Sequence, residues 1–170
     1  TVIVGAPTYP GAIRTFRARG ARILTVPQDD DGLDPAALKQ TLTSLRAAGV
    51  RPKLLYVVPN YDNPTGATLP LERRQTIVRL AHEYGTLIVE DDAYAGLDLD
   101  GPPPSSLFAL AHGRGVIQLG TFSKTIASGL RVAWVLAERP IVDALVGKQY
   151  RFLPTVPLDV CGMAEPDAAR

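Results

Sequence analysis

One short stretch of the chain combines an amine, two hydroxyls and a guanidinium. Residues 120–125 read Gly-Thr-Phe-Ser-Lys-Thr, and Arg131 follows in a Gly-Leu-Arg run. The amine of Lys124 can form an imine with an aldehyde. The hydroxyls of Thr121 and Ser123, with the guanidinium of Arg131, can hold a phosphate. Pyridoxal 5'-phosphate carries both groups, although a solvated lysine beside a capping serine explains the same run.

A polar turn follows an apolar strand candidate earlier in the chain. Residues 54–58 are Leu-Leu-Tyr-Val-Val, and Asn63 opens the run Asn-Pro-Thr-Gly. An asparagine at a strand end can donate a hydrogen bond to the phenolate oxygen of pyridoxal phosphate. The bond between Asn63 and Pro64 is also a candidate for the cis form. An ordinary turn without a ligand accounts for the same residues.

Three acids come directly after a second apolar strand candidate. Residues 86–89 are Thr-Leu-Ile-Val, and Glu90, Asp91 and Asp92 follow. Carboxylates at the carboxyl end of a buried parallel strand lie in the crevice where open α/β sheets bind ligands. Such an acid can pair with the protonated nitrogen of a pyridine ring and keep it cationic. The acids can also cap a helix or bind Mg²⁺, but no further Asp, Glu or His cluster in the sequence favours a metal.

The elements that carry these residues alternate between strand and helix. Strands are predicted at 2–4, 22–26, 53–57, 86–89, 116–119 and 132–136, and helices at 11–19, 35–48, 70–84 and 140–150. Asp34 and Pro35 form a helix start, Gly49 a stop, and residues 99–106, with three prolines, a loop. Alternation of this kind predicts an α/β fold with three layers, α-β-α, around a mostly parallel sheet.

Composition limits the classes of partner. The chain has 170 residues, of which 46% are hydrophobic and 21% charged, and its net charge is +1. No basic stretch indicates nucleic acid and no apolar run approaches the length of a membrane span, so neither partner is expected. A single cysteine excludes an internal disulfide framework and favours a cytoplasmic location.

Four ordered stretches resemble the fold-type I pyridoxal-phosphate enzymes, and among them the class I and II aminotransferases. They are Pro-Thr-Tyr-Pro-Gly at 7–11, Asn-Pro-Thr-Gly at 63–66, Asp-Asp-Ala-Tyr at 91–94, and Ser-Lys at 123–124 with Gly-Leu-Arg at 129–131. Their order and separations agree with the family from the first residue to about residue 151. By eye the chain is most similar to the aminoadipate, aromatic and branched-chain subgroup.

The resemblance implies a reaction and its two central residues. Lys124 matches the lysine that forms the imine with the cofactor and moves the proton of the substrate. Asp91 matches the acid that pairs with the pyridine nitrogen. Asp92 is its nearest rival, but the family pattern Asp-x-Ala-Tyr selects the first acid. The implied activity is transamination between an amino acid and a 2-oxo acid.

The remaining matches imply contacts with the cofactor. Asn63 and Tyr94 match the two donors to its phenolate oxygen, and Tyr9 matches the aromatic residue that stacks on its ring. Three further matches are implied contacts of the phosphate group: Thr121, Ser123 and Arg131.

Both ends of the chain depart from the family pattern. We expect residues 1–152 to be the central part of the large, cofactor-binding domain and residues 153–170 to be an atypical tail. Part of the phosphate site and most of the substrate site would lie elsewhere in a longer parent protein. The resemblance implies a homodimer for that parent, and we expect the piece alone to be weakly active or inactive.

Two alternatives remain open at the level of sequence. Other fold-type I enzymes, such as β-lyases, decarboxylases and acyltransferases, use the same lysine and acid. The effector domain of GntR/MocR-type transcription regulators is an aminotransferase-like domain that binds pyridoxal phosphate, and the run at 120–125 is similar to theirs. Those regulators usually have another residue where Asn63 stands.

Overall fold

The computed structural model describes residues 1–97, 101–130 and 132–149. Its strands are β1 (Val2–Ala6), β2 (Ile23–Asp29), β3 (Gly32–Leu33), β4 (Leu54–Val57), β5 (Leu87–Asp91), β6 (Val116–Thr121) and β7 (Ala133–Leu136). Its helices are α1 (Pro10–Ala18), α2 (Pro35–Ala47), α3 (Leu71–Tyr84), α4 (Leu107–Leu110) and α5 (Arg139–Gln149), with a short 3-10 helix at Ser128–Leu130.

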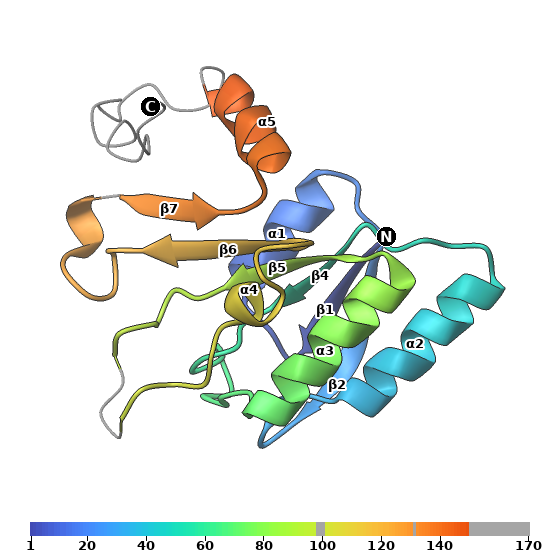
Figure 1. Cartoon of the computed structure of the whole chain (residues 1–170). Helices are drawn as coiled ribbons and strands as arrows, with labels where there is room; N and C mark the ends of the chain where they lie inside the picture. The colour runs from blue at the N-terminus through green and yellow to red at the C-terminus, as the bar shows by residue number, and fades with distance from the viewer. Residues whose placement is uncertain (98–100, 131, 150–170) are drawn as a thin grey trace, which may run out of the picture. The chain divides into compact units, whose positions relative to one another are not determined.

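One mixed sheet contains all the strands of the described residues, in the order β3-β2-β1-β4-β5-β6-β7 (Figure 1). The five inner strands, from β2 to β6, run parallel to one another. The edge strands β3 and β7 each pair antiparallel with their neighbour. The predicted α/β fold with a mostly parallel sheet is therefore confirmed.

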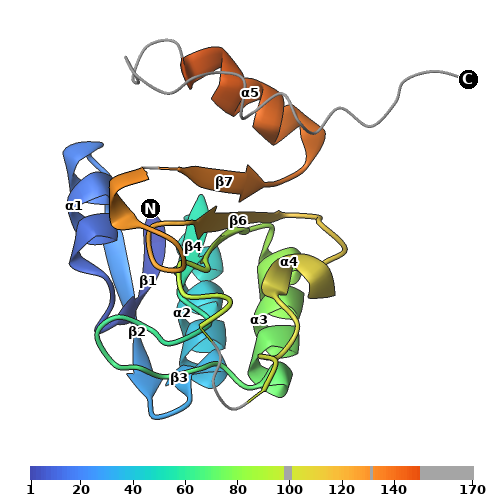
Figure 2. The ribbon, with the colours of Figure 1, turned by 90° about the vertical axis from the view of Figure 1, so that its left-hand side faces the viewer.

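Helices bury both faces of the parallel sheet. Helix α1 lies on one face, and α2, α3 and α4 lie on the other (Figure 2). Because side chains alternate along a strand, Ile3 and Leu55 enter the core under α2 to α4, whereas Val4 and Tyr56 pack toward α1. Near-continuous apolar strands are expected when both faces are covered.

The predicted start and stop of α2 are confirmed. The carboxylate of Asp34 accepts a hydrogen bond from the backbone N–H of Ala36 at 2.8 Å, and Pro35 is the first helical residue. At the other end, α2 stops at Ala47 and Gly49 has φ of 68°. Glycine adopts that left-handed conformation without strain.

Most of the observed inner strands extend further at their carboxyl ends than the sequence predicts, and the short helix α4 is not predicted. Most of the predicted inner strands stop two or three residues before the observed carboxyl end, and the two-residue β3 was not predicted. About half of the extra residues are polar, and β5 shows how a polar residue remains in the sheet. The carboxylate of Glu90 accepts backbone N–H groups from Leu107 at 2.7 Å and Phe108 at 2.9 Å, so a fully buried acid is satisfied inside the strand.

The described chain separates into two units, and α5 belongs to the second, which starts at Arg139. Within α5, Arg139 and Asp143 form an ion pair of 2.8 Å. The tail expected at residues 153–170 lies outside the described residues. Among the helices of the described residues, none has the combined length and apolar character that a membrane crossing requires.

The cap of α2 gives a test of the local structure. We expect Asp34→Ala to lower the free energy of unfolding by about 1 kcal/mol, because one backbone N–H of the first turn loses its acceptor. Asp34→Asn keeps an acceptor oxygen, so its free energy of unfolding should stay close to that of the unmutated chain. Urea unfolding of the purified protein measures the difference. Equal losses in both variants would contradict the assigned cap.

Candidate active site

Four neighbouring parallel strands deliver the predicted residues to one edge of the sheet. Strands β1, β4, β5 and β6 are adjacent and parallel. Tyr9 follows β1, Asn63 follows β4, Asp91 ends β5, and Lys124 follows β6. The carboxyl ends of parallel strands lie at the same edge, which is where open α/β sheets bind ligands.

Tyr9 and Asp91 line the same pocket. It has a volume of about 480 Å³ and lies between the first turns of α1 and the ends of the central strands; Tyr56 and Leu119 also line it. Tyr9 is 41% exposed. It lies so close to Gly11 that a Cβ atom at that position would come within 2.5 Å of the ring. Glycine at this position therefore lets the aromatic ring lie against the start of α1.

A tyrosine that was not predicted holds the acid in this pocket. The hydroxyl of Tyr56 donates a hydrogen bond of 2.5 Å to Oδ2 of Asp91. Burial raises the pKa of Asp91, and the hydrogen bond from Tyr56 opposes that rise. Burial and the neighbouring Asp91 raise the pKa of Tyr56, so Tyr56 remains a donor at neutral pH. Its position in an apolar strand carried no sign of this role.

The two neighbouring acids point into different surroundings. Asp91 faces the α1 side of the sheet with Tyr56, as the pocket shows. Asp92 is only 7% exposed and accepts hydrogen bonds from Nδ2 of Asn60 at 2.7 Å and Nε2 of Gln118 at 3.2 Å. This placement supports the choice of Asp91 over Asp92 as the partner of a ligand.

Lys124 and Tyr94 lie together although 30 positions separate them in the numbering. The Nζ atom of Lys124 is 5.6 Å from the centroid of the Tyr94 ring, which is within the range of a cation–π contact. Lys124 is exposed and Tyr94 half-buried. The amine is therefore accessible at the same sheet edge as the pocket.

Thr121 and Asn63, two further predicted residues, have different local surroundings. The Thr121 hydroxyl accepts the backbone N–H of Ser123 at 3.1 Å and donates to the carbonyl of Val132 at 3.2 Å, so it organises the turn after β6. Asn63 is half-buried, and its bond to Pro64 is cis. Arg131 lies outside the described residues.

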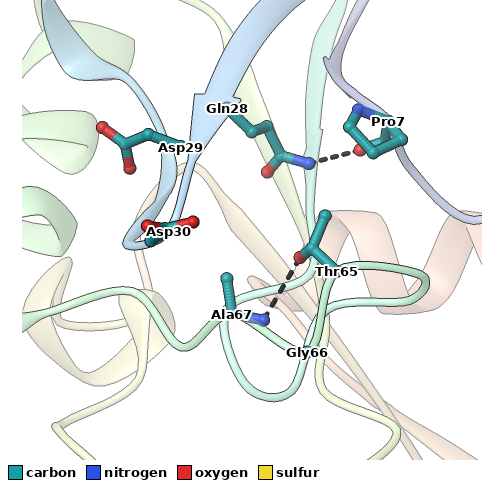
Figure 3. A pocket seen from close by; sticks show the side chains of 7 residues that line it. All are labelled: Pro7, Gln28, Asp29, Asp30, Thr65, Gly66 and Ala67. Atoms are coloured by element: carbon teal, nitrogen blue, oxygen red, sulfur yellow. Dashed lines mark hydrogen bonds between the residues drawn. The ribbon is translucent and has the colours of Figure 1, made fainter.

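A glutamine joins the segments that carry Tyr9 and Asn63. Figure 3 shows a second pocket, of about 340 Å³, at the ends of β1 and β2. In it, Nε2 of Gln28 donates to the carbonyl of Pro7. The same nitrogen donates to Oδ2 of Asp62 at 3.1 Å. Gln28 thus connects Pro7, two residues before Tyr9, with Asp62, the residue before Asn63, and nothing in its own segment of the sequence indicates this contact.

The contact between Tyr56 and Asp91 leads to a prediction that needs no ligand. We expect Tyr56→Phe to raise the pKa of Asp91 further, because burial remains and the hydrogen bond that favours the carboxylate is lost. NMR of the Asp91 carboxyl carbon across a pH titration measures the change. The control is Tyr84→Phe, whose hydroxyl shares a 2.9 Å hydrogen bond with Thr43 away from this pocket. An Asp91 pKa that stays the same or falls in Tyr56→Phe would show that the hydrogen bond has no such effect.

Comparisons with known proteins identify the family of this chain. The family model for aminotransferase class I and II matches residues 1–157. The chain is 42% identical over 148 residues to the 2-aminoadipate transaminase of Thermus thermophilus, a match that covers 85% of this chain and 36% of that protein. It is 33% identical over 144 residues to YisV of Bacillus subtilis, an uncharacterized HTH-type transcriptional regulator, with 85% of this chain and 29% of that protein covered.

The fold also matches solved structures. A structure of kynurenine aminotransferase from Pyrococcus horikoshii, in complex with PMP, has a TM-score of 0.84 and 37% sequence identity to this chain. That match covers 88% of this chain and 37% of the Pyrococcus chain. The present chain thus spans about a third of the length of these relatives. With the family model covering most of its residues, the chain belongs to the class I and II aminotransferases.

Proposed function

We propose that this chain holds pyridoxal 5'-phosphate and forms part of an enzyme that transfers an amino group between an amino acid and a 2-oxo acid. The observation that carries the proposal is the pocket that Tyr9 and Asp91 both line. Lys124 is exposed at the same edge of the sheet. The PMP complex of the similar Pyrococcus structure supports the choice of cofactor.

The residues of the pocket fit such a cofactor chemically. Tyr9 offers a flat, partly exposed ring that can stack on a pyridine ring. Asp91 offers a carboxylate that can accept a hydrogen bond from the protonated pyridine nitrogen, and Tyr56 favours the charged form of that carboxylate. The bound cofactor supplies an aldehyde for the amine of the substrate and a cationic ring that accepts electrons.

Lys124 has the role of the base in this proposal. Lys124 is exposed, and its Nζ atom is 5.6 Å from the centroid of the Tyr94 ring. In this role Nζ of Lys124 would take the proton from the substrate as a general base.

Further parts of the proposal come from the family resemblance. Asn63 and Tyr94 would donate to the ring oxygen of the cofactor, and Thr121, Ser123 and Arg131 would contact its phosphate. The substrates would be an amino acid and a 2-oxo acid, the complete protein a homodimer, and its location cytoplasmic. The aminotransferases among its relatives support the reaction class.

The match with the Bacillus regulator supports a second candidate, an effector domain that binds the cofactor without turnover. Both candidates require Lys124 and the pocket, but they differ in the reaction that an added amino acid undergoes. An enzyme releases a 2-oxo acid, whereas an effector domain does not. Assaying 2-oxo acid with the purified protein separates the two.

The experiment that tests the proposal is an absorbance titration with pyridoxal phosphate. We expect an absorbance band near the visible edge in the unmutated chain, because imine formation with a lysine changes the absorbance of the cofactor. Lys124→Ala should abolish that band, and an amino acid added to the unmutated chain should bleach it. Lys39→Ala removes an exposed lysine of α2 and should leave the band intact.

Two results would contradict parts of this proposal. A band that persists in Lys124→Ala would mean that another amine reacts with the cofactor, and the assigned role of Lys124 would be wrong. If the unmutated chain shows no band although circular dichroism shows that it is folded, cofactor binding by this chain is contradicted.

A further inference from the structure

A buried arginine binds three chain segments: the start and the end of the connection between β4 and α3, and the residues before α4. Arg74 lies on α3 and is fully buried. Its guanidinium is 2.7 Å (Nε) from the carbonyl of Leu69, and Nη2 is 3.1 Å from the carbonyl of Pro59 and 2.6 Å from Oδ1 of Asn60. Nη1 donates to the carbonyls of Pro104 at 3.0 Å and Ser105 at 3.3 Å.

These hydrogen bonds use the whole donor set of the guanidinium. Arginine has five N–H donors in a fixed plane, and the five contacts assign one acceptor to each. All five acceptors are neutral oxygens. Removing such a donor leaves buried acceptors without a partner, which costs more than an exposed hydrogen bond is worth.

Arg74 fixes both ends of the loop that carries Asn63. We define the Asn63 loop as residues 58–70, between β4 and α3. Pro59 and Leu69, whose carbonyls contact Arg74, lie near its two ends. The backbone N–H of Leu69 also donates to the carbonyl of Pro59 at 2.9 Å, which closes the loop.

Asn60 connects Arg74 to Asp92, the residue that follows β5. Arginine only donates hydrogen bonds, so the amide oxygen of Asn60 must face Arg74 and the amide nitrogen must face away. That nitrogen donates to Oδ1 of Asp92 at 2.7 Å. Asp92 is thereby held from one side by Asn60 and from the other by Gln118, at 3.2 Å.

Asp92 is the residue directly after Asp91, and the two side chains have different surroundings. Fixing Asp92 on the α3 side of the sheet fixes the backbone from which Asp91 projects toward Tyr56 and the pocket. We infer that Arg74 is a positioning residue of the active site. Through its contacts with the Asn63 loop and through Asn60 and Asp92, it holds Asn63 and Asp91 in place without touching the ligand.

This inference rests in part on the proposed function, so its test has one arm without cofactor. The variant is Arg74→Lys, which keeps the positive charge but replaces the planar guanidinium by a compact ammonium group. The matched control is Arg73→Lys. Arg73 is the preceding residue of α3, and it bonds Asp29 at the surface at 2.7 Å. Asn60→Ala is the second variant, because it cuts the link to Asp92 and leaves the other contacts of Arg74 in place.

Without cofactor, hydrogen exchange of backbone amides measures the order of the Asn63 loop. In Arg74→Lys we expect the amides of Asp62, Gly66 and Leu69, which are bonded within the loop, to exchange about tenfold faster, the effect of one lost charged hydrogen bond. The amides of α2 should not change, and neither should any of these amides in Arg73→Lys. Unchanged exchange in the loop overturns the inference, whether or not the chain binds a cofactor.

With cofactor, the affinity for pyridoxal phosphate and the pH midpoint of the Lys124-dependent band are measured. We expect Arg74→Lys and Asn60→Ala to bind about tenfold more weakly. Arg74→Lys should also shift the midpoint to higher pH, because a donor to the ring oxygen is misplaced, and we expect the same direction of shift in Asn63→Ala. Combining Arg74→Lys with Asn63→Ala should give no further shift.

A purely structural role would give a different result. Arg74→Lys would then lower the melting temperature and leave the affinity and the midpoint of the folded protein unchanged, which overturns the inference. If the unmutated chain binds no cofactor, the proposed function is contradicted instead. In that case the exchange rates still decide whether Arg74 orders the Asn63 loop.

Discussion

Burial of the parallel sheet on both faces is the constraint on which the rest of this structure depends. Apolar side chains fill the strand interiors because α1 covers one face and α2 to α4 cover the other. Polar side chains can then enter the sheet only near its ends, where partners satisfy them. The carboxyl ends of β1, β4, β5 and β6 collect such residues, and the candidate site is made there.

The three acids at the end of β5 show how this constraint divides the work. Alternation along the strand places Glu90 and Asp92 on the side of α3 and α4, where backbone and amide groups satisfy them. Asp91, between them, faces the pocket. Two of the acids are therefore structural, and one is available to a ligand. An acidic run that looked uniform in the sequence has three different surroundings.

The sequence predicted the layers of the fold better than it predicted the details of the site. Apolar runs and helix caps such as Asp34 act locally, so their pattern reveals the elements. Tyr56, Gln28 and Arg74 act through contacts with residues far away in the chain. Each of them has an ordinary appearance in its own segment, since a tyrosine in a strand or an arginine in a helix carries no local mark. Their importance follows only from the pairing of strands and the closure of loops.

The close approach of Gly11 to the ring of Tyr9 has a consequence for how this family of sequences can vary. A larger residue at position 11 requires the ring at position 9 to move or to become smaller. Substitutions at the two positions are then not independent, and their free-energy effects should not add. Exchange of the aromatic residue for one of another size is thus tied to a change in the first turn of the helix that follows it.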